Sequence, residues 1–136
     1  LPFIAAQLIG GIIGVLIVHA MFDLPLLQLG IKSRTGTGQW IGEFVATFGL
    51  LFTIVVGSRQ RPDAVPALVA LWIVAGYWLT SSTSFANPAI TIARAMTDSF
   101  AGIRPIDAPG FILAQFAGAA VGVIIGRWLN GPREVA

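Results

Sequence analysis

Four long apolar segments constrain this chain more than any other feature of its sequence. They cover residues 1–22, 39–57, 64–83 and 109–129. Each is close to the roughly 20 residues that a helix needs to cross the hydrocarbon of a lipid bilayer. The ionisable side chains inside them are His19, Glu43 and, at the end of the last segment, Arg127. This pattern predicts an all-α membrane protein, folded as a single membrane domain over residues 1–136.

Composition argues against other classes of protein. The chain is 56% hydrophobic and 10% charged, whereas about a quarter of the residues in a soluble domain are charged. Barrel strands of about 10 alternating residues do not fit such long apolar runs. The eight Lys and Arg residues form no basic stripe, so we expect no nucleic-acid partner. With no Cys, one His and no paired nucleophile and base in the segments, we expect no metal, no cofactor and no enzyme activity.

The first and last segments are related to each other. A shift of 108 positions lays FIAAQLIG (3–10) on FILAQFAG (111–118), with Gln7 matched to Gln115. The shared Gln and the shared glycines favour an ancestral repeat over the alternative, which is convergent membrane composition. Whatever precedes the last helix should then also have preceded the first. We therefore expect the chain to be a fragment that lacks most of one repeat.

The segment between the last two spans contains a predicted half-length helix. Asn87 is a good N-cap and Pro88 suits the first helical position, so we expect a helix over residues 87–100. Because it is too short to span, we interpret it as re-entrant. Its irregular approach at residues 80–86 is then tolerated only inside protein or beside water. The alternative is a helix lying on the membrane surface.

A re-entrant helix at this place favours a pore. Its N-terminus carries about half a positive charge and unpaired N–H groups, and the Asn87 amide lies beside it. Backbone carbonyls come from the irregular stretch Thr83, Ser84, Phe85 and Ala86. A small neutral solute with hydroxyl groups can bond to both kinds of group, whereas a cation meets an unfavourable dipole.

These residues resemble a known family. Asn87-Pro88-Ala89, after a Thr/Ser-rich approach and before one terminal span, resembles the second half of the aquaporin (major intrinsic protein) family, whose signature is two NPA half-helices meeting at mid-membrane. The resemblance covers essentially the whole chain and implies a partial aquaporin fold, with helices one and two and the first NPA absent. It further implies a passive channel for water and small uncharged solutes, a multi-pass place in the lipid bilayer of the cell inner membrane, and a homotetramer of the full-length protein.

Glu43 supports this resemblance independently. A carboxylate within a membrane helix costs at least about 2.5 kcal/mol unless it is paired. In the family, an acidic residue of the fourth helix holds the backbone of the NPA loop, and Glu43 occupies that place; the alternative is a carboxylate that reaches the headgroups. We expect Gln7 and Gln115 to form inter-helix hydrogen bonds. His19 and Asp23, four residues apart at a helix end, are expected to form a solvated pair rather than a proton relay.

The resemblance also indicates which residues would select the solute. Family members usually place an Arg directly after the second NPA, where this chain has Ile90. By the same spacing the other filter positions are Ser84 and Ala75, or Gly76 if that register is shifted by one. Small or apolar groups at these positions imply a wide constriction. Arg94, one turn beyond Ile90, is expected to pair with Asp98.

Two further interpretations concern substrate and function class. The segment TSFANPAITIARAMTDSFAGI is similar to bacterial members associated with arsenic resistance, which implies undissociated arsenous acid as a substrate beside glycerol-like polyols. The competing class is a secondary transporter built from inverted repeats, which needs a coupling site, and only Glu43 is placed for one. A non-conducting membrane scaffold, in which Asn87 would be dispensable, is the third class.

Overall fold

The computed structural model describes residues 1–131. This part of the chain contains helices and connecting segments only. The α-helices are α1 (Pro2–Met21), α2 (Thr37–Gln60), α3 (Val65–Leu79), α4 (Pro88–Arg94) and α5 (Ala108–Asn130), and the 3-10 turns are η1 (Pro62–Ala64) and η2 (Pro105–Asp107). Segments apolar and long enough to cross a membrane are Pro2–Met21, Thr37–Gln60, Pro62–Leu79 and Pro105–Asn130. The all-helical membrane fold predicted from the sequence is confirmed.

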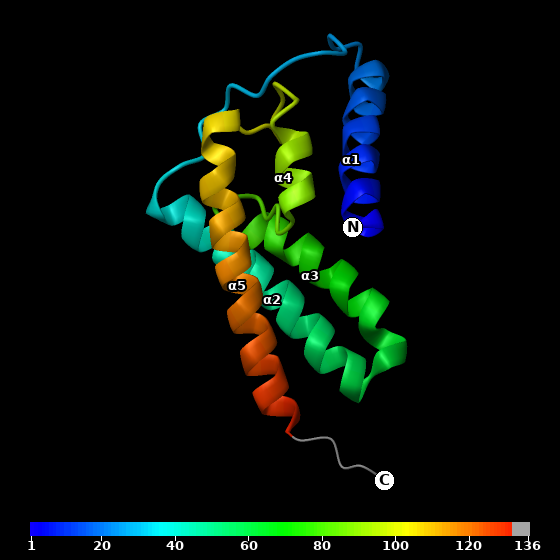
Figure 1. Cartoon of the computed structure of the whole chain (residues 1–136), viewed down its shortest axis with the longest axis vertical. Coiled ribbons are helices and arrows are strands. Elements are labelled where there is room, and N and C mark those ends of the chain that lie inside the picture. The colour runs from blue at the N-terminus through cyan, green and yellow to red at the C-terminus, as the bar shows by residue number, and fades with distance from the viewer. Residues whose placement is uncertain (132–136) are drawn as a thin grey trace.

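Close packing of α5 across α2 forms the centre of the fold (Figure 1). Gly118 and Gly122, one turn apart on α5, make this approach possible. A Cβ atom on Gly118 would overlap the carbonyl oxygen of Phe44, and one on Gly122 would lie 2.6 Å from the carbonyl oxygen of Phe48. Small residues bring helix backbones together where lipid offers no hydrophobic gain. The glycines of the last span therefore set the distance between α2 and α5.

In contrast, α1 stands apart from this pair and packs against α4 (Figure 1). A Cβ atom on Gly11 would lie 3.1 Å from the Cβ atom of Ala93, whereas nothing lies within 4 Å of such an atom on Gly10 or Gly14. The outward face of α1 is apolar, with exposed side chains that include Phe3, Ile9, Ile13 and Ile17. A helix surrounded by lipid or by further membrane helices presents such a face.

Helix α3 ends before the predicted boundary of residues 64–83. Thr80 is extended, with ψ of 141°, so the last helical residue is Leu79. The hydroxyl of Thr80 donates to the carbonyl oxygen of Gly76 at 2.7 Å. A hydroxyl that bonds to the turn before it competes with the helical ladder, which favours an end at this place.

The half-helix prediction over residues 87–100 was too long, because α4 ends at Arg94. The carbonyl oxygen of Arg94 accepts from the N–H of Ile103 at 3.2 Å, and that of Ala95 accepts from the N–H of Gly30 at 2.9 Å. These distant partners replace the next helical hydrogen bonds. After α4 the chain therefore folds back toward α5 instead of continuing as a helix.

Substitution of the α5 glycines tests this packing. We expect Gly118→Ala to lower the melting temperature of the protein in detergent, because the added methyl group forces the two backbones apart at a cost of about 1 to 3 kcal/mol. Gly38→Ala in α2 is the matched control, since nothing lies within 4 Å of its Cβ position. Equal melting temperatures for the two variants would contradict the close packing.

Candidate functional site

The segment that joins α3 to α4 has an unusual backbone. Thr83, Ser84 and Ala86 have φ values of 63°, 50° and 49°, in the left-handed region that residues with a side chain rarely adopt. Each such residue costs of the order of 1 to 3 kcal/mol unless the surrounding structure compensates. This segment must therefore be held by contacts from elsewhere in the fold.

Glu43, on α2, provides the first of these contacts. Its side chain is fully buried. Oε1 accepts from the backbone N–H of Phe85 at 2.8 Å, and Oε2 accepts from the backbone N–H of Ala86 at 2.9 Å. Oε2 also accepts from Nε2 of Gln115 on α5 at 2.6 Å, and the same nitrogen lies 2.9 Å from Oγ1 of Thr91 on α4. A buried carboxylate that accepts three hydrogen bonds is well satisfied. Glu43 thus joins α2 to the loop and to α5, and Gln115 extends this network to α4.

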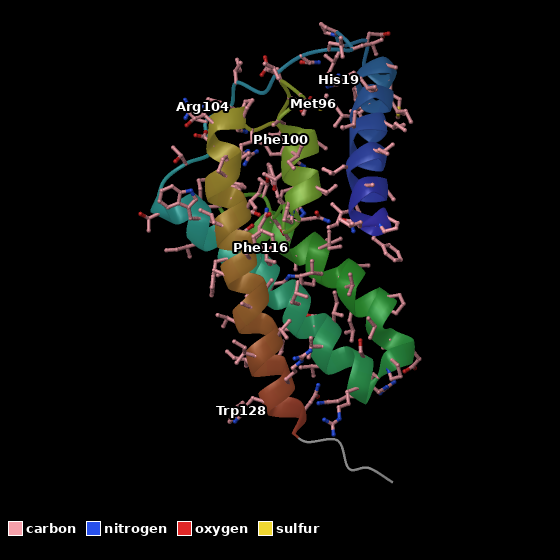
Figure 2. The ribbon with its side chains drawn as sticks, viewed as in Figure 1. His19, Met96, Phe100, Arg104, Phe116 and Trp128 are labelled. Carbon is pink, nitrogen blue, oxygen red and sulfur yellow. The ribbon has the colours of Figure 1, made fainter. Side chains whose placement is uncertain are left out.

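Arg34, in the connection between α1 and α2, provides the second contact. Its guanidinium group donates to the carbonyl oxygens of Ser82 at 3.0 Å, Gly102 at 2.7 Å and Phe100 at 2.9 Å. Burial lowers the pKa of Arg34 from its ordinary value, and the nearby charge of Arg94 acts in the same direction. An arginine nonetheless stays protonated in a protein. Arg34 therefore brings a permanent positive charge to the end of the molecule where Phe100 lies (Figure 2).

Sequence reasoning missed Arg34. No local pattern in the sequence marks this residue out as part of the candidate site. Its carbonyl partners lie 48 to 68 residues away along the chain. The only signal available was the residue type, since a planar guanidinium group with five donors is well suited to gather several carbonyl oxygens.

Glu43 and Arg34, which anchor the loop, leave a row of its backbone carbonyl oxygens without a hydrogen-bond partner within residues 1–131. No hydrogen bond from the described part of the chain reaches the carbonyl oxygens of Thr83, Ser84, Phe85 and Ala86. At the end of this row, Oδ1 of Asn87 accepts from the N–H of Ala89 at 2.8 Å and caps α4. Nδ2 of Asn87 lies 3.4 Å from Oε1 of Gln7 on α1. Four carbonyl oxygens, which accept hydrogen bonds, are therefore followed along the chain by the Asn87 amide, which donates them.

Open space borders α4 at two places. A cavity of about 270 Å³ lies at its start, where Ala86, Asn87 and Pro88 are among the lining residues. A second cavity, of about 500 Å³, lies between α1 and α4. We call it the Ile90 cavity, and its α4 side is formed by Ile90, Ala93 and Arg94 with Thr97 beyond them.

The remaining residues of the predicted site lie in different environments. Ser84 lies against Gly76, since a Cβ atom on that glycine would be 2.9 Å from Oγ of Ser84. Ala75 is exposed on α3. The Phe85 ring is buried and packs against Phe111, with ring centroids 5.1 Å apart. Phe85 therefore contributes its backbone to the loop and its ring to the core, where Ala89 is buried as well.

The expected pair of Arg94 and Asp98 does not form among the residues that the structure describes. Helix α4 ends at Arg94, so the spacing of four residues no longer places the two side chains on one helix face. The guanidinium carbon of Arg94 instead lies 4.3 Å from the centroid of the Phe85 ring.

The expectation of a solvated His19 and Asp23 pair was wrong. His19 is fully buried, with Nε2 at 2.8 Å from Oγ1 of Thr97 and Nδ1 at 3.0 Å from the carbonyl oxygen of Leu26. Helix α1 ends at Met21 and the chain turns back over its end, which covers the imidazole. Figure 2 shows His19 at the end of α1. This histidine ties α1 to the segment that follows α4.

Comparison with known proteins gives one clear similarity. The chain is 51% identical over 130 residues to aquaglyceroporin AqpS of Rhizobium meliloti (strain 1021). The match covers 96% of this chain and 56% of the relative, so the chain spans about half of the relative's length. No family model and no solved structure matches the chain.

Two substitutions of Glu43 test its role as an anchor. In the full-length protein, Glu43→Gln keeps one acceptor for the loop, whereas Glu43→Leu leaves the N–H groups of Phe85 and Ala86 without a partner and leaves Nε2 of Gln115 with Thr91 alone. We expect Glu43→Leu to be the more destabilising, since each stranded donor costs about 1 to 3 kcal/mol. Folded yield and melting in detergent measure the difference. Equal behaviour of the two variants would indicate that the carboxylate does not hold the loop.

Proposed function

Because this chain belongs to the aquaporin (major intrinsic protein) family, we propose that the full-length protein is a passive transmembrane channel for water and small uncharged solutes. The observation that carries the proposal is the row of unused carbonyl oxygens that leads to Asn87 at the start of α4. A solute with hydroxyl groups donates to these oxygens and accepts from the Asn87 amide. Such a row replaces the water that the solute loses on entry.

Exclusion of ions and protons is part of the same proposal. The N-terminal end of a helix carries a partial positive charge, and Asn87 marks that end of α4. A cation in the pore would meet this charge, whereas a neutral solute would not.

We further propose that the channel accepts glycerol-like polyols and undissociated arsenous acid. The side chain of Ile90, which lines the cavity between α1 and α4, is apolar and uncharged. Ser84 and Gly76, which lie against each other, are small. These groups support a wide constriction. The name aquaglyceroporin, given to the relative AqpS, is in keeping with this substrate class. Family membership also supports a place in the cell inner membrane and assembly as a homotetramer.

Flux measurements test the proposed function. The full-length protein is reconstituted in liposomes, and the entry of water, glycerol and arsenous acid is followed in the same preparation. We expect flux that rises linearly with solute concentration and does not depend on an ion gradient. Asn87→Leu should reduce solute flux about tenfold, which corresponds to one lost hydrogen bond of about 1.4 kcal/mol. Saturating, gradient-driven flux would indicate a transporter, and full flux in Asn87→Leu would contradict a role for this site.

The selectivity assigned to Ile90 is tested by its exchange for a bulky cation. We expect Ile90→Arg to reduce the passage of glycerol and arsenous acid more than that of water, because a guanidinium group narrows the path while still donating to water. Ile90→Leu, which keeps an apolar group, is the matched control. The readout is the ratio of solute flux to water flux per amount of folded protein. An unchanged ratio would show that Ile90 does not line the constriction.

A further inference from the structure

Arg94 has an unusual environment for a cation. It lines the Ile90 cavity one helical turn beyond Ile90 itself. Its Nη1 atom is buried and has no hydrogen-bond partner among the described residues. Its side chain forms no ion pair within residues 1–131 either. Buried polar groups are normally paired, so an arginine left in this state beside an open cavity calls for a functional explanation.

Arg94 stacks on an aromatic ring that a second arginine also contacts. The Phe85 ring lies 4.3 Å from its guanidinium carbon, and the same ring lies 5.1 Å from the guanidinium carbon of Arg34. Arg34 directs its donors to three carbonyl oxygens, so its hydrogen bonds are already used. Two permanent positive charges thus lie near one ring, and only Arg94 of the two borders the cavity.

We propose that Arg94 is a specificity-determining residue that excludes cations from the Ile90 cavity, which rests on the proposed channel function. A fixed positive charge at a partly buried site repels cations strongly, because water and salt screen it less there than in bulk solvent. A neutral solute meets no such barrier.

Width and charge are then set by two different residues of α4. Ile90 sets the width of the path with an apolar group, and Arg94 one turn away sets its charge. An arginine at the position of Ile90 would perform both tasks together and would narrow the path. With the charge displaced by one turn, the channel can be wide enough for a polyol and still reject ions.

Charge and packing are distinguished by two substitutions of Arg94. Arg94→Lys keeps the positive charge but loses the flat stacking surface on Phe85, whereas Arg94→Met keeps much of the volume and loses the charge. Arg94→Gln is a second neutral variant, to be used if Arg94→Met does not fold. Lys32→Met is the matched control, because Lys32 also lies over an aromatic ring, 4.5 Å from the Phe100 centroid, but is exposed and outside the cavity.

The experiment measures cation leak and glycerol flux in parallel. Liposomes that contain the full-length protein are loaded with potassium, and its loss down a gradient is followed beside glycerol entry. For Arg94→Met we expect a rise in potassium leak of roughly tenfold or more, since the lost repulsion is of the order of one charge pair at short range, with glycerol flux maintained. Arg94→Lys and Lys32→Met should leak no more than the unmodified protein.

Two results would overturn the proposal. Unchanged potassium leak in folded Arg94→Met or Arg94→Gln, with glycerol flux maintained, would show that the charge is not a barrier. A potassium leak that rises to the same level in Arg94→Lys and in Arg94→Met would show that stacking on Phe85, rather than charge, keeps ions out. Absence of glycerol flux in the unmodified protein would instead contradict the channel function itself, so the two failures are distinguishable.

Discussion

The buried carboxylate of Glu43 is the interaction on which the rest of the site depends. Three residues of the loop before α4 have left-handed backbone angles, and such a conformation persists only when other contacts compensate for its cost. The two oxygens of Glu43 bind two consecutive N–H groups of that loop. With the N–H groups directed to the carboxylate, the carbonyl oxygens of the same residues remain available to a solute.

The position of this carboxylate follows from the packing of the long helices. Glycines of α5 allow α5 to lie directly on α2, and Gln115 of α5 thereby reaches Glu43 of α2. Arg34 holds the other side of the loop through Ser82. The irregular segment is thus fixed by side chains from regular helices and from a distant connection. In the proposed pore, the polar lining comes from backbone atoms, which carry no net charge.

Residues with local signals could be read from the sequence. The apolar segments predict the membrane helices because a helix needs about 20 residues to cross a bilayer, and Asn87 before Pro88 marks the start of α4 through capping chemistry. The end of α4 could not be predicted, since the carbonyl oxygens of Arg94 and of Ala95 after it bond to Ile103 and Gly30. The partners of Arg34 and the burial of His19 were missed for the same reason. Each depends on residues brought together only by the tertiary fold.

Hydrogen exchange at single amides tests the central claim most directly. Phe85 and Ala86 belong to no helix or strand, yet their N–H groups bond to a buried carboxylate. In the full-length protein, their amides should exchange as slowly as those of the buried turns of α2. Exchange as fast as that of the exposed connection at Leu27 would show that Glu43 does not hold the loop and would contradict the account.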